Sequence, residues 1–153
     1  MDATALLPVL AASDITDARL RRLFEHWDAR RRGARLPNRA AIDVVELKPW
    51  LGNLLLIEVI DGGRDFRYRV YGSTLAQYYG RDLTGKTIAE ARAETREIVR
   101  SEYLSVVREG RPLLVKRDRP VLHRQARVAK LILPLTCDGS SVGMLLVGAY
   151  PES

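Results

Sequence analysis

The spacing of apolar residues near the N-terminus predicts an amphipathic helix. Capping and acidic residues at 13–17 favour its start and the arginines at 30–32 favour its end, so we expect it over about residues 14–32. An apolar stripe at positions i, i+3, i+4 and i+7 runs along one face of this helix and consists of Leu20, Leu23, Phe24 and Trp27. The stripe needs an apolar partner, which is either the rest of its own domain or a second copy of the chain. In the second case these four residues form a homodimer interface.

A β-hairpin is predicted further along the chain. The apolar run over residues 54–60 ends at the turn sequence Asp61-Gly62-Gly63, and residues 66–71 then alternate in polarity. Because side chains on a strand alternate between faces, the second strand has two distinct sides. One side carries Phe66, Tyr68 and Val70, and the other carries Arg67, Arg69 and Tyr71.

Short helices and three more strands follow the hairpin. We expect a short helix ending before Gly80, a turn with a capping box at residues 87–90, and a longer helix over residues 95–109. Strand patterns then cover residues 113–119, 124–135 and 142–150. Connections this short between strands favour an antiparallel sheet with helices inserted in the middle. The sequence therefore predicts an α+β fold and not a parallel nucleotide-binding fold.

The composition fits one folded domain in a reducing compartment. The chain has 153 residues, of which 46% are hydrophobic and 29% are charged, so it can bury a core. Its one cysteine, Cys137, cannot form an internal disulfide. The apolar run at the N-terminus lacks preceding basic residues, and no run approaches the roughly 20 apolar residues of a membrane span. We expect a cytoplasmic protein without a membrane segment.

The net charge of +6 is distributed unevenly. Residues 19–39 carry eight arginines against two acidic residues, and residues 108–130 carry eight basic residues against two acidic ones. The first segment leaves open a regulator that binds nucleic acid through residues 19–39. No helix-turn-helix, zinc finger or aromatic RNA-binding platform accompanies it, so an acidic protein partner is an equal alternative.

The sequence contains no recognisable catalytic or metal-binding motif. His26 and His123 lack a second ligand at zinc spacing, and Cys137 lies in a predicted turn. We found no nucleophile elbow, phosphate-binding loop or dinucleotide-binding glycine motif. We therefore expect no catalytic residues and no metal site. A small α+β enzyme with an internal cavity stays open as an alternative, because groups distant in sequence can converge in a fold.

The order of these elements, together with several short motifs, resembles the PAS family of sensor domains, and more narrowly the single-domain PAS proteins of alphaproteobacteria. The resemblance covers about residues 36–150. The matching motifs, besides the strand at 54–60, are Leu36-Pro37-x-Arg39, Phe66-x-Tyr68-Arg69-Val70-x-Gly72-Ser73-x-Leu75, Gly80-x-Asp82-Leu83-Thr84-Gly85, Gly110-x-Pro112, and Leu131-x-Leu133-Pro134-Leu135 before Asp138-Gly139.

The resemblance implies a PAS-like five-stranded antiparallel sheet around a small cavity, with short helices inserted between strands 2 and 3. It divides the chain into an N-terminal segment, 1–35, and a PAS-like domain, 36–153. It implies a non-catalytic sensory or regulatory module that binds a small molecule or a partner protein. The expected module is a homodimer that signals to another protein in trans, because no output segment follows Tyr150.

The expected ligand pocket lies among tyrosines, which combine apolar bulk with one polar tip. The pocket candidates are Tyr68, Arg69, Tyr78 and Tyr103. Arg69 favours an anionic ligand if it points inward and is a surface residue if it points outward. The light-sensing PAS branch carries its cysteine in an Asn-Cys-Arg motif, which is absent here. Neither haem nor flavin is therefore supported by a motif, and the ligand stays unnamed.

Overall fold

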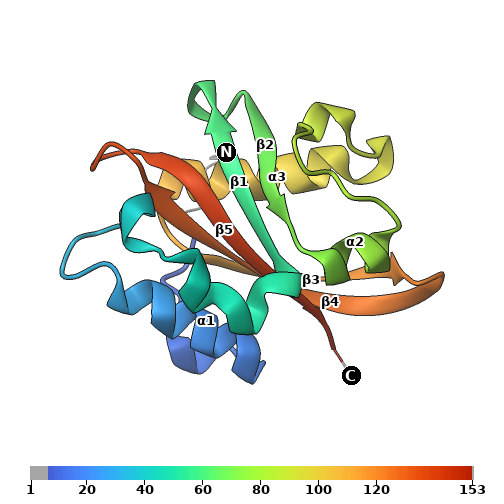
Figure 1. The fold of residues 1–153 in the computed structure, drawn as a ribbon, viewed down its shortest axis with the longest axis horizontal. Helices are drawn as coiled ribbons and strands as arrows, with labels where there is room; N and C mark the ends of the chain where they lie inside the picture. Colours follow the sequence, from blue (N-terminus) through green and yellow to red (C-terminus); the bar gives the residue numbers. More distant parts are fainter. Residues whose placement is uncertain (1–6, 153) are drawn as a thin grey trace.

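Five strands form one antiparallel sheet. The computed structural model describes residues 7–152. In chain order the strands are β1 (Leu54–Ile60), β2 (Asp65–Tyr71), β3 (Leu113–Val121), β4 (Arg124–Thr136) and β5 (Val142–Pro151). Their order in the sheet is β2-β1-β5-β4-β3, and all neighbouring strands run antiparallel (Figure 1). The predicted α+β class and the five-stranded sheet are confirmed.

Helices cover both faces of the sheet. Three helical segments lie between strands 2 and 3, as expected: α2 (Ser73–Tyr79), the 3-10 turn η5 (Ile88–Glu90) and α3 (Ala93–Glu109). The N-terminal helix α1 (Ala18–Ala29) lies on the face opposite α3, and η3 (Val44–Asn53) precedes β1 (Figure 1). The remaining 3-10 turns are η1 (Ala12–Asp14), η2 (Arg39–Ala41) and η4 (Asp61–Gly63). Within residues 7–152, none of the helices combines the length and apolar character needed to cross a membrane.

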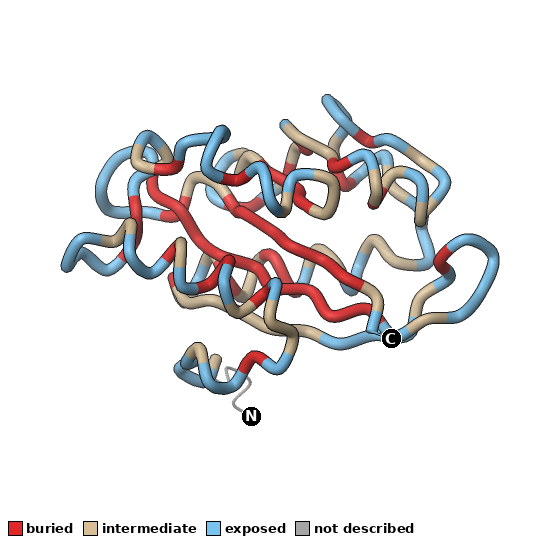
Figure 2. The backbone as a smooth tube through the Cα atoms, turned by 60° about the horizontal axis from the view of Figure 1, so that its bottom comes forward, coloured by how far each residue is buried: buried red, intermediate tan, exposed pale blue. Residues whose placement is uncertain are grey.

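The central strands are buried on both sides. Most of β4 and β5 is buried along continuous runs and not at alternate residues. Figure 2 shows these buried runs in the middle of the molecule, with exposed segments around them. A strand covered on one face alternates between buried and exposed side chains, so continuous burial follows from helices packing on both faces.

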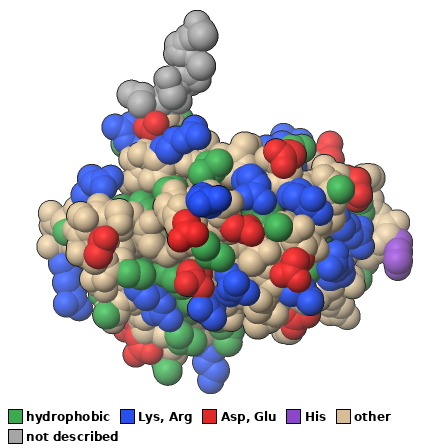
Figure 3. Space-filling model, turned by 90° about the horizontal axis from the view of Figure 1, so that it is seen from above, with side chains coloured by type: hydrophobic (Ala, Val, Ile, Leu, Met, Phe, Trp, Pro, Cys, Tyr) green, Lys and Arg blue, Asp and Glu red, His purple; other side chains and the backbone are tan. Residues whose placement is uncertain are grey.

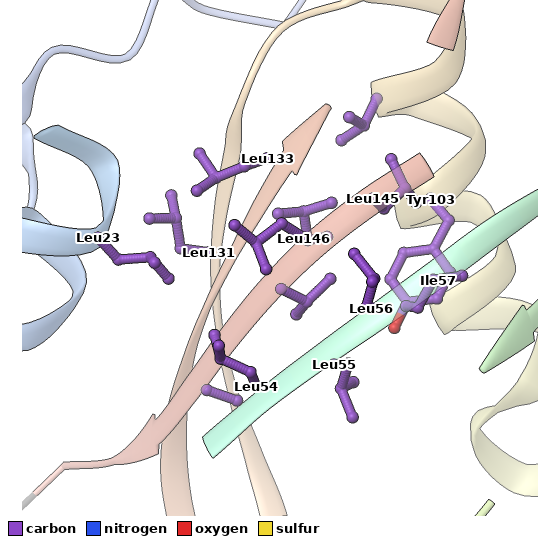
Figure 4. Packing of buried hydrophobic residues seen from close by; sticks show 14 of the residues in the cluster. Leu23, Leu54, Leu55, Leu56, Ile57, Tyr103, Leu131, Leu133, Leu145 and Leu146 are labelled. Carbon is purple, nitrogen blue, oxygen red and sulfur yellow. The ribbon is translucent and has the colours of Figure 1, made fainter. Parts of the chain in front are cut away.

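Helix α1 packs on the sheet of its own chain. All four residues of its apolar stripe are buried within the monomer. The indole Nε1 of Trp27 donates a hydrogen bond to the carbonyl oxygen of Pro134 in β4, at 2.8 Å. Figure 4 shows Leu23 pointing toward Leu131 and Leu133 of the sheet. The expectation that this stripe is a homodimer interface is therefore wrong, because its side chains are already covered by β4 and β5.

A glycine in β5 explains how α1 approaches so closely. A Cβ atom at Gly148 would lie 2.7 Å from Cδ2 of Leu23 and 3.1 Å from Cδ2 of Leu20. The helix is also shorter than the expected 14–32. Asp17 is its N-cap, since its carboxylate accepts hydrogen bonds from the backbone N–H groups of Arg19 and Leu20.

A β-bulge in β2 changes which of its side chains share a face. Leu55 of β1 pairs with Tyr71, whereas Ile57 pairs with Tyr68, so β2 has one extra residue at this point. Leu55 and Ile57 lie on the same face of β1, and their partners therefore do so as well. The rings of Tyr68 and Tyr71 are 5.2 Å apart between centroids. The strict alternation that separated Tyr71 from Tyr68 is wrong for this reason.

The turn from β2 into α2 requires a glycine. A Cβ atom at Gly72 would lie 2.2 Å from the carbonyl oxygen of Gly52 and 2.8 Å from that of Leu51. Both obstacles are backbone atoms of η3, so no side chain could move away to make room. Gly72 thus allows η3 and the start of α2 to pack directly against each other, which fixes α2 beside the sheet.

Candidate functional site

A cavity lies between the sheet and the helices on the α3 side. Its volume is about 430 Å³, a size that accommodates a small organic molecule. β1 and β5 form its floor, α2, η5 and α3 form its sides, and the β3–β4 hairpin borders its mouth. Its apolar lining includes Leu55, Leu75, Leu83, Ile88 and Val99. Its aromatic lining consists of Tyr68, Tyr71, Tyr78, Tyr79 and Tyr103.

Tyr103 anchors α3 to the sheet at the base of this cavity. Its side chain is fully buried and extends from α3 toward the sheet (Figure 4). Its ring meets Phe66 edge to face, with 5.4 Å between centroids. Aromatic pairs in this arrangement add stability beyond the area they bury. Val99 and Tyr103 are separated by one helical turn and therefore lie on the same face of α3. This face points toward the floor of the cavity.

Three of the four predicted pocket residues line the cavity. Tyr68, Tyr78 and Tyr103 do so, whereas Arg69 does not. The side chain of Arg69 is 54% exposed and forms an ion pair with Glu58 at 2.7 Å. The expectation for Arg69 is wrong, because it lies outside the cavity at the bulge of β2.

Two cations that the sequence analysis did not select line the cavity instead. Arg119 of β3 places its guanidinium 4.1 Å above the ring centroid of Tyr79. Lys130 of β4 lies with its Nζ 5.3 Å from the ring centroid of Tyr103. Lys130 was detectable in principle, since it is the only charged residue in the apolar run 128–135. Arg119 gave no such signal, because it lies in an arginine-rich stretch.

Lys130 belongs to a buried ionic group. The Glu102 carboxylate of α3 is 5% exposed and lies 2.6 Å from Nζ of Lys130. Its other oxygen accepts a hydrogen bond from Nε of Arg117 at 2.5 Å. Burial lowers the pKa of Lys130 below the usual 10.5, and the Glu102 carboxylate counteracts this shift. The group connects α3 to β3 and β4 at the edge of the cavity.

The histidines and the cysteine do not converge. Within residues 7–152 no group of three or more His, Cys, Asp or Glu side chains is arranged to hold a metal ion. His26 packs against Trp50, with 5.8 Å between ring centroids, and lies 3.8 Å from Glu46. His123 lies at the mouth of the cavity, and Cys137 is exposed in the β4–β5 turn.

Many arginines of the segment 19–39 are held by groups of the protein itself. Arg30 pairs with Glu46 at 2.7 Å, and Arg31 pairs with Asp28 at 2.5 Å. Arg19 pairs with Asp17 and lies 4.0 Å from the ring centroid of Tyr150. These contacts compete with phosphate binding and so weaken the nucleic-acid alternative. Figure 3 shows the molecule from above, on the side away from α1, and basic and acidic side chains are interspersed there as well.

The cavity tyrosines make the protein sensitive to high pH. Burial raises the pKa of four of them above the usual 10.0: Tyr68, Tyr71, Tyr79 and Tyr103. Above about pH 10 the unfolded chain loses these protons and the folded chain keeps them, so stability falls as the pH rises. We expect phenolate absorbance to increase together with the loss of circular dichroism.

Urea-unfolded protein is the reference for this titration, since its tyrosines ionise near their ordinary pKa. Ionisation of all six tyrosines near pH 10.0 in a protein with intact circular dichroism would contradict the prediction. It would mean that water reaches the phenols freely and that the cavity is open.

The fold is similar to that of a solved PAS domain. The PAS domain of Bordetella pertussis BvgS aligns with a TM-score of 0.55 and 18% identity, covering 73% of this chain and 88% of that one. A fungal LOV domain photoreceptor aligns with a TM-score of 0.46 and 12% identity, covering 74% of this chain and 94% of that one. No curated protein matches the chain.

The family model described as PAS domain matches residues 15–150. The match includes α1 and runs across the boundary that we expected between residues 35 and 36. It agrees with the order of the five strands and with the helices inserted between strands 2 and 3. The chain therefore belongs to the PAS domain family.

Proposed function

We propose that this chain is a sensory or regulatory module that binds a small molecule in the cavity between its sheet and α2, η5 and α3. The observation that carries the proposal is the cavity itself, with about 430 Å³ of space and an apolar and tyrosine-rich lining. Apolar walls with a few polar tips are typical of sites that bind and orient a ligand. PAS domains are in general sensory modules and not enzymes, which agrees with recognition as the role of this cavity.

The β3–β4 hairpin is the element best placed to report occupancy. The backbone N–H of Leu122, at the tip of the hairpin, donates a hydrogen bond to the carbonyl oxygen of Tyr78 in α2, at 3.0 Å. Leu122 and His123 have φ values of 52° and 66°, a left-handed conformation that is strained for such side chains. A ligand that moves α2 would therefore also move the hairpin, and we propose that a partner protein detects this change.

We keep a homodimer in the proposal, but with an interface other than the apolar stripe on α1. The stripe on α1 is buried against β4 and β5, so a second copy would have to bind elsewhere.

Native mass spectrometry of freshly purified protein tests the proposed function. We expect an excess mass that disappears when the protein is denatured, since a tightly bound molecule is retained through purification. An absorbance spectrum of the same sample identifies the molecule if it is haem or flavin.

A matched pair of variants localises the bound molecule. Val99→Trp adds an indole at a residue that lines the cavity, and Val45→Trp adds the same group at a residue that is exposed. We expect the first variant to lose the excess mass and the second to keep it. Wild-type protein that has the mass of the chain alone, and whose melting temperature does not respond to a library of metabolites, would contradict the proposal.

A further inference from the structure

The charges that line the cavity are mostly of one sign. The lining includes five cationic side chains but only one carboxylate, that of Glu94, which is exposed. The cations are Arg81, Arg92, Arg96, Arg119 and Lys130. Clefts lined by one sign of charge concentrate ligands of the opposite sign. The surplus of positive charge therefore favours an anionic ligand, and the contacts of the individual cations indicate where its acid group binds.

Arg119 lies beside the tyrosines of the cavity and has unused hydrogen-bonding capacity. Its Nε is buried and has no hydrogen-bond partner, and no carboxylate among residues 7–152 forms an ion pair with it. Its guanidinium lies 4.1 Å above the ring centroid of Tyr79, and its charge opposes the rise that burial causes in the pKa of Tyr68, Tyr71 and Tyr79. Burying a polar group without a hydrogen-bond partner costs free energy, so an acceptor from a ligand would stabilise Arg119 at this position.

Lys130 lies near Arg119 and is only partly neutralised. Its side chain is 10% exposed, and the repulsion from Arg119 contributes to lowering its pKa. Its partner Glu102 also binds Arg117, so one carboxylate serves two cations. A small recess of about 100 Å³ adjoins the cavity and is lined by these cations and by Asp118. Asp118 is highly exposed and pairs with Arg127, which leaves the positive surplus inside in place.

We infer that the cavity binds a small amphiphilic anion, with its carboxylate or phosphate group at Arg119 and Lys130 and its apolar body against the tyrosines and leucines. The inference rests on the proposed function and names the chemistry of its ligand. A guanidinium offers paired donors that match both kinds of acid group, and the ammonium adds a point charge. The apolar lining accounts for the rest of the molecule, since inorganic ions alone would leave most of the cavity unfilled.

Calorimetric titration with matched probes tests the inference. Phenylacetate and phenyl phosphate carry the two acid groups, and phenylacetamide is the neutral counterpart of the first. We expect at least one acid to bind, and phenylacetamide to bind about 10- to 100-fold more weakly than phenylacetate if the group is a carboxylate. Tight binding of phenyl phosphate alone identifies a phosphate ligand.

Variants connect this binding to the two cations. We expect Arg119→Gln to weaken acid binding by about tenfold or more, whereas Arg108→Gln removes an equal charge from an exposed position outside the lining and leaves binding unchanged. Lys130→Met combined with Glu102→Gln removes both charges of the buried pair together, so that neither is left alone. Arg119→Gln decides the question if that double variant does not fold.

Several outcomes overturn the inference. If phenylacetamide binds as tightly as the acids, and Val99→Trp blocks it, the cavity binds small molecules but has no acid site, and the proposed function stands. If Arg108→Gln weakens acid binding as much as Arg119→Gln does, the anions bind the arginine-rich surface. If none of the probes binds, the inference fails, and the excess mass in native mass spectrometry then decides the proposed function separately.

Discussion

Replacing Leu23 with aspartate is expected to unfold most of the protein. Leu23 is fully buried between α1 and the sheet, beside Gly148 of β5. Truncation of a buried leucine to alanine costs about 2–5 kcal/mol, and an aspartate there adds a buried charge without a partner. Since a domain of this size is stable by about 5–15 kcal/mol, the substitution removes much or all of that margin. Urea denaturation followed by circular dichroism measures the loss.

The neighbouring substitution Arg22→Asp is the control for this experiment. It introduces the same carboxylate one residue earlier, on the exposed side of α1, and we expect it to change stability by less than about 1 kcal/mol. A Leu23→Asp protein that is fully folded and has half the wild-type mass in solution would contradict the structure. It would show that the stripe faces a second copy, as the sequence alone allowed.

The partner of an amphipathic helix is not encoded in its periodicity. The spacing of the stripe residues correctly predicts that one face of α1 is buried, but a neighbouring sheet and a second copy satisfy that requirement equally well. The deciding information lies far away in the sequence. Gly148 removes a side chain from β5 where α1 crosses it, and the carbonyl group of Pro134 accepts the hydrogen bond of Trp27.

The strands and helices themselves could be predicted because each carries a strong local pattern. The strand at residues 66–71, the turn at residues 61–63 and the helix stop at Gly110 all depend on neighbours in sequence, and the structure confirms them. The bulge in β2 depends on how β1 pairs with it, which is not a local property. Tyr71 therefore shares a face with Tyr68 and lines the cavity, while Arg69 lies outside it.

The charged part of the site was missed for a similar reason. Arg119 and Lys130 belong to two strands, and neither is close in sequence to the tyrosines beside which it lies. In a chain with 25 basic residues, composition cannot single out the two that lie against tyrosine rings of the cavity. Only the pairing of Val115 with Lys130 and of Arg119 with Ala126 places both on the face of the sheet that α3 covers.

Glu102→Leu is expected to be the most destabilising single change in the polar part of the core. It leaves Lys130 buried without its carboxylate, and breaking a buried pair from one side costs about 3–5 kcal/mol. Burial already lowers the pKa of Lys130, and the loss of Glu102 lowers it further. The pKa of Lys130 in the folded variant then lies below the lysine pKa of 10.5 in the unfolded chain, so between these two values the folded variant binds fewer protons. The loss of stability relative to the wild type therefore becomes smaller as the pH rises toward 10.5.

Urea denaturation at several pH values measures this loss of stability, and two further variants serve as comparisons. Glu102→Leu combined with Lys130→Met replaces both members of the buried pair, and we expect it to recover most of the lost stability because no buried charge remains unpaired. Arg117 also loses its carboxylate, but its side chain is 42% exposed, so water can solvate its charge. Glu152→Leu removes the carboxylate from the more exposed pair with Lys116, at 3.2 Å, and we expect a cost below about 1 kcal/mol. If Glu102→Leu costs no more than Glu152→Leu, water reaches Lys130 freely, and the cation is not held in a desolvated position at the edge of the cavity.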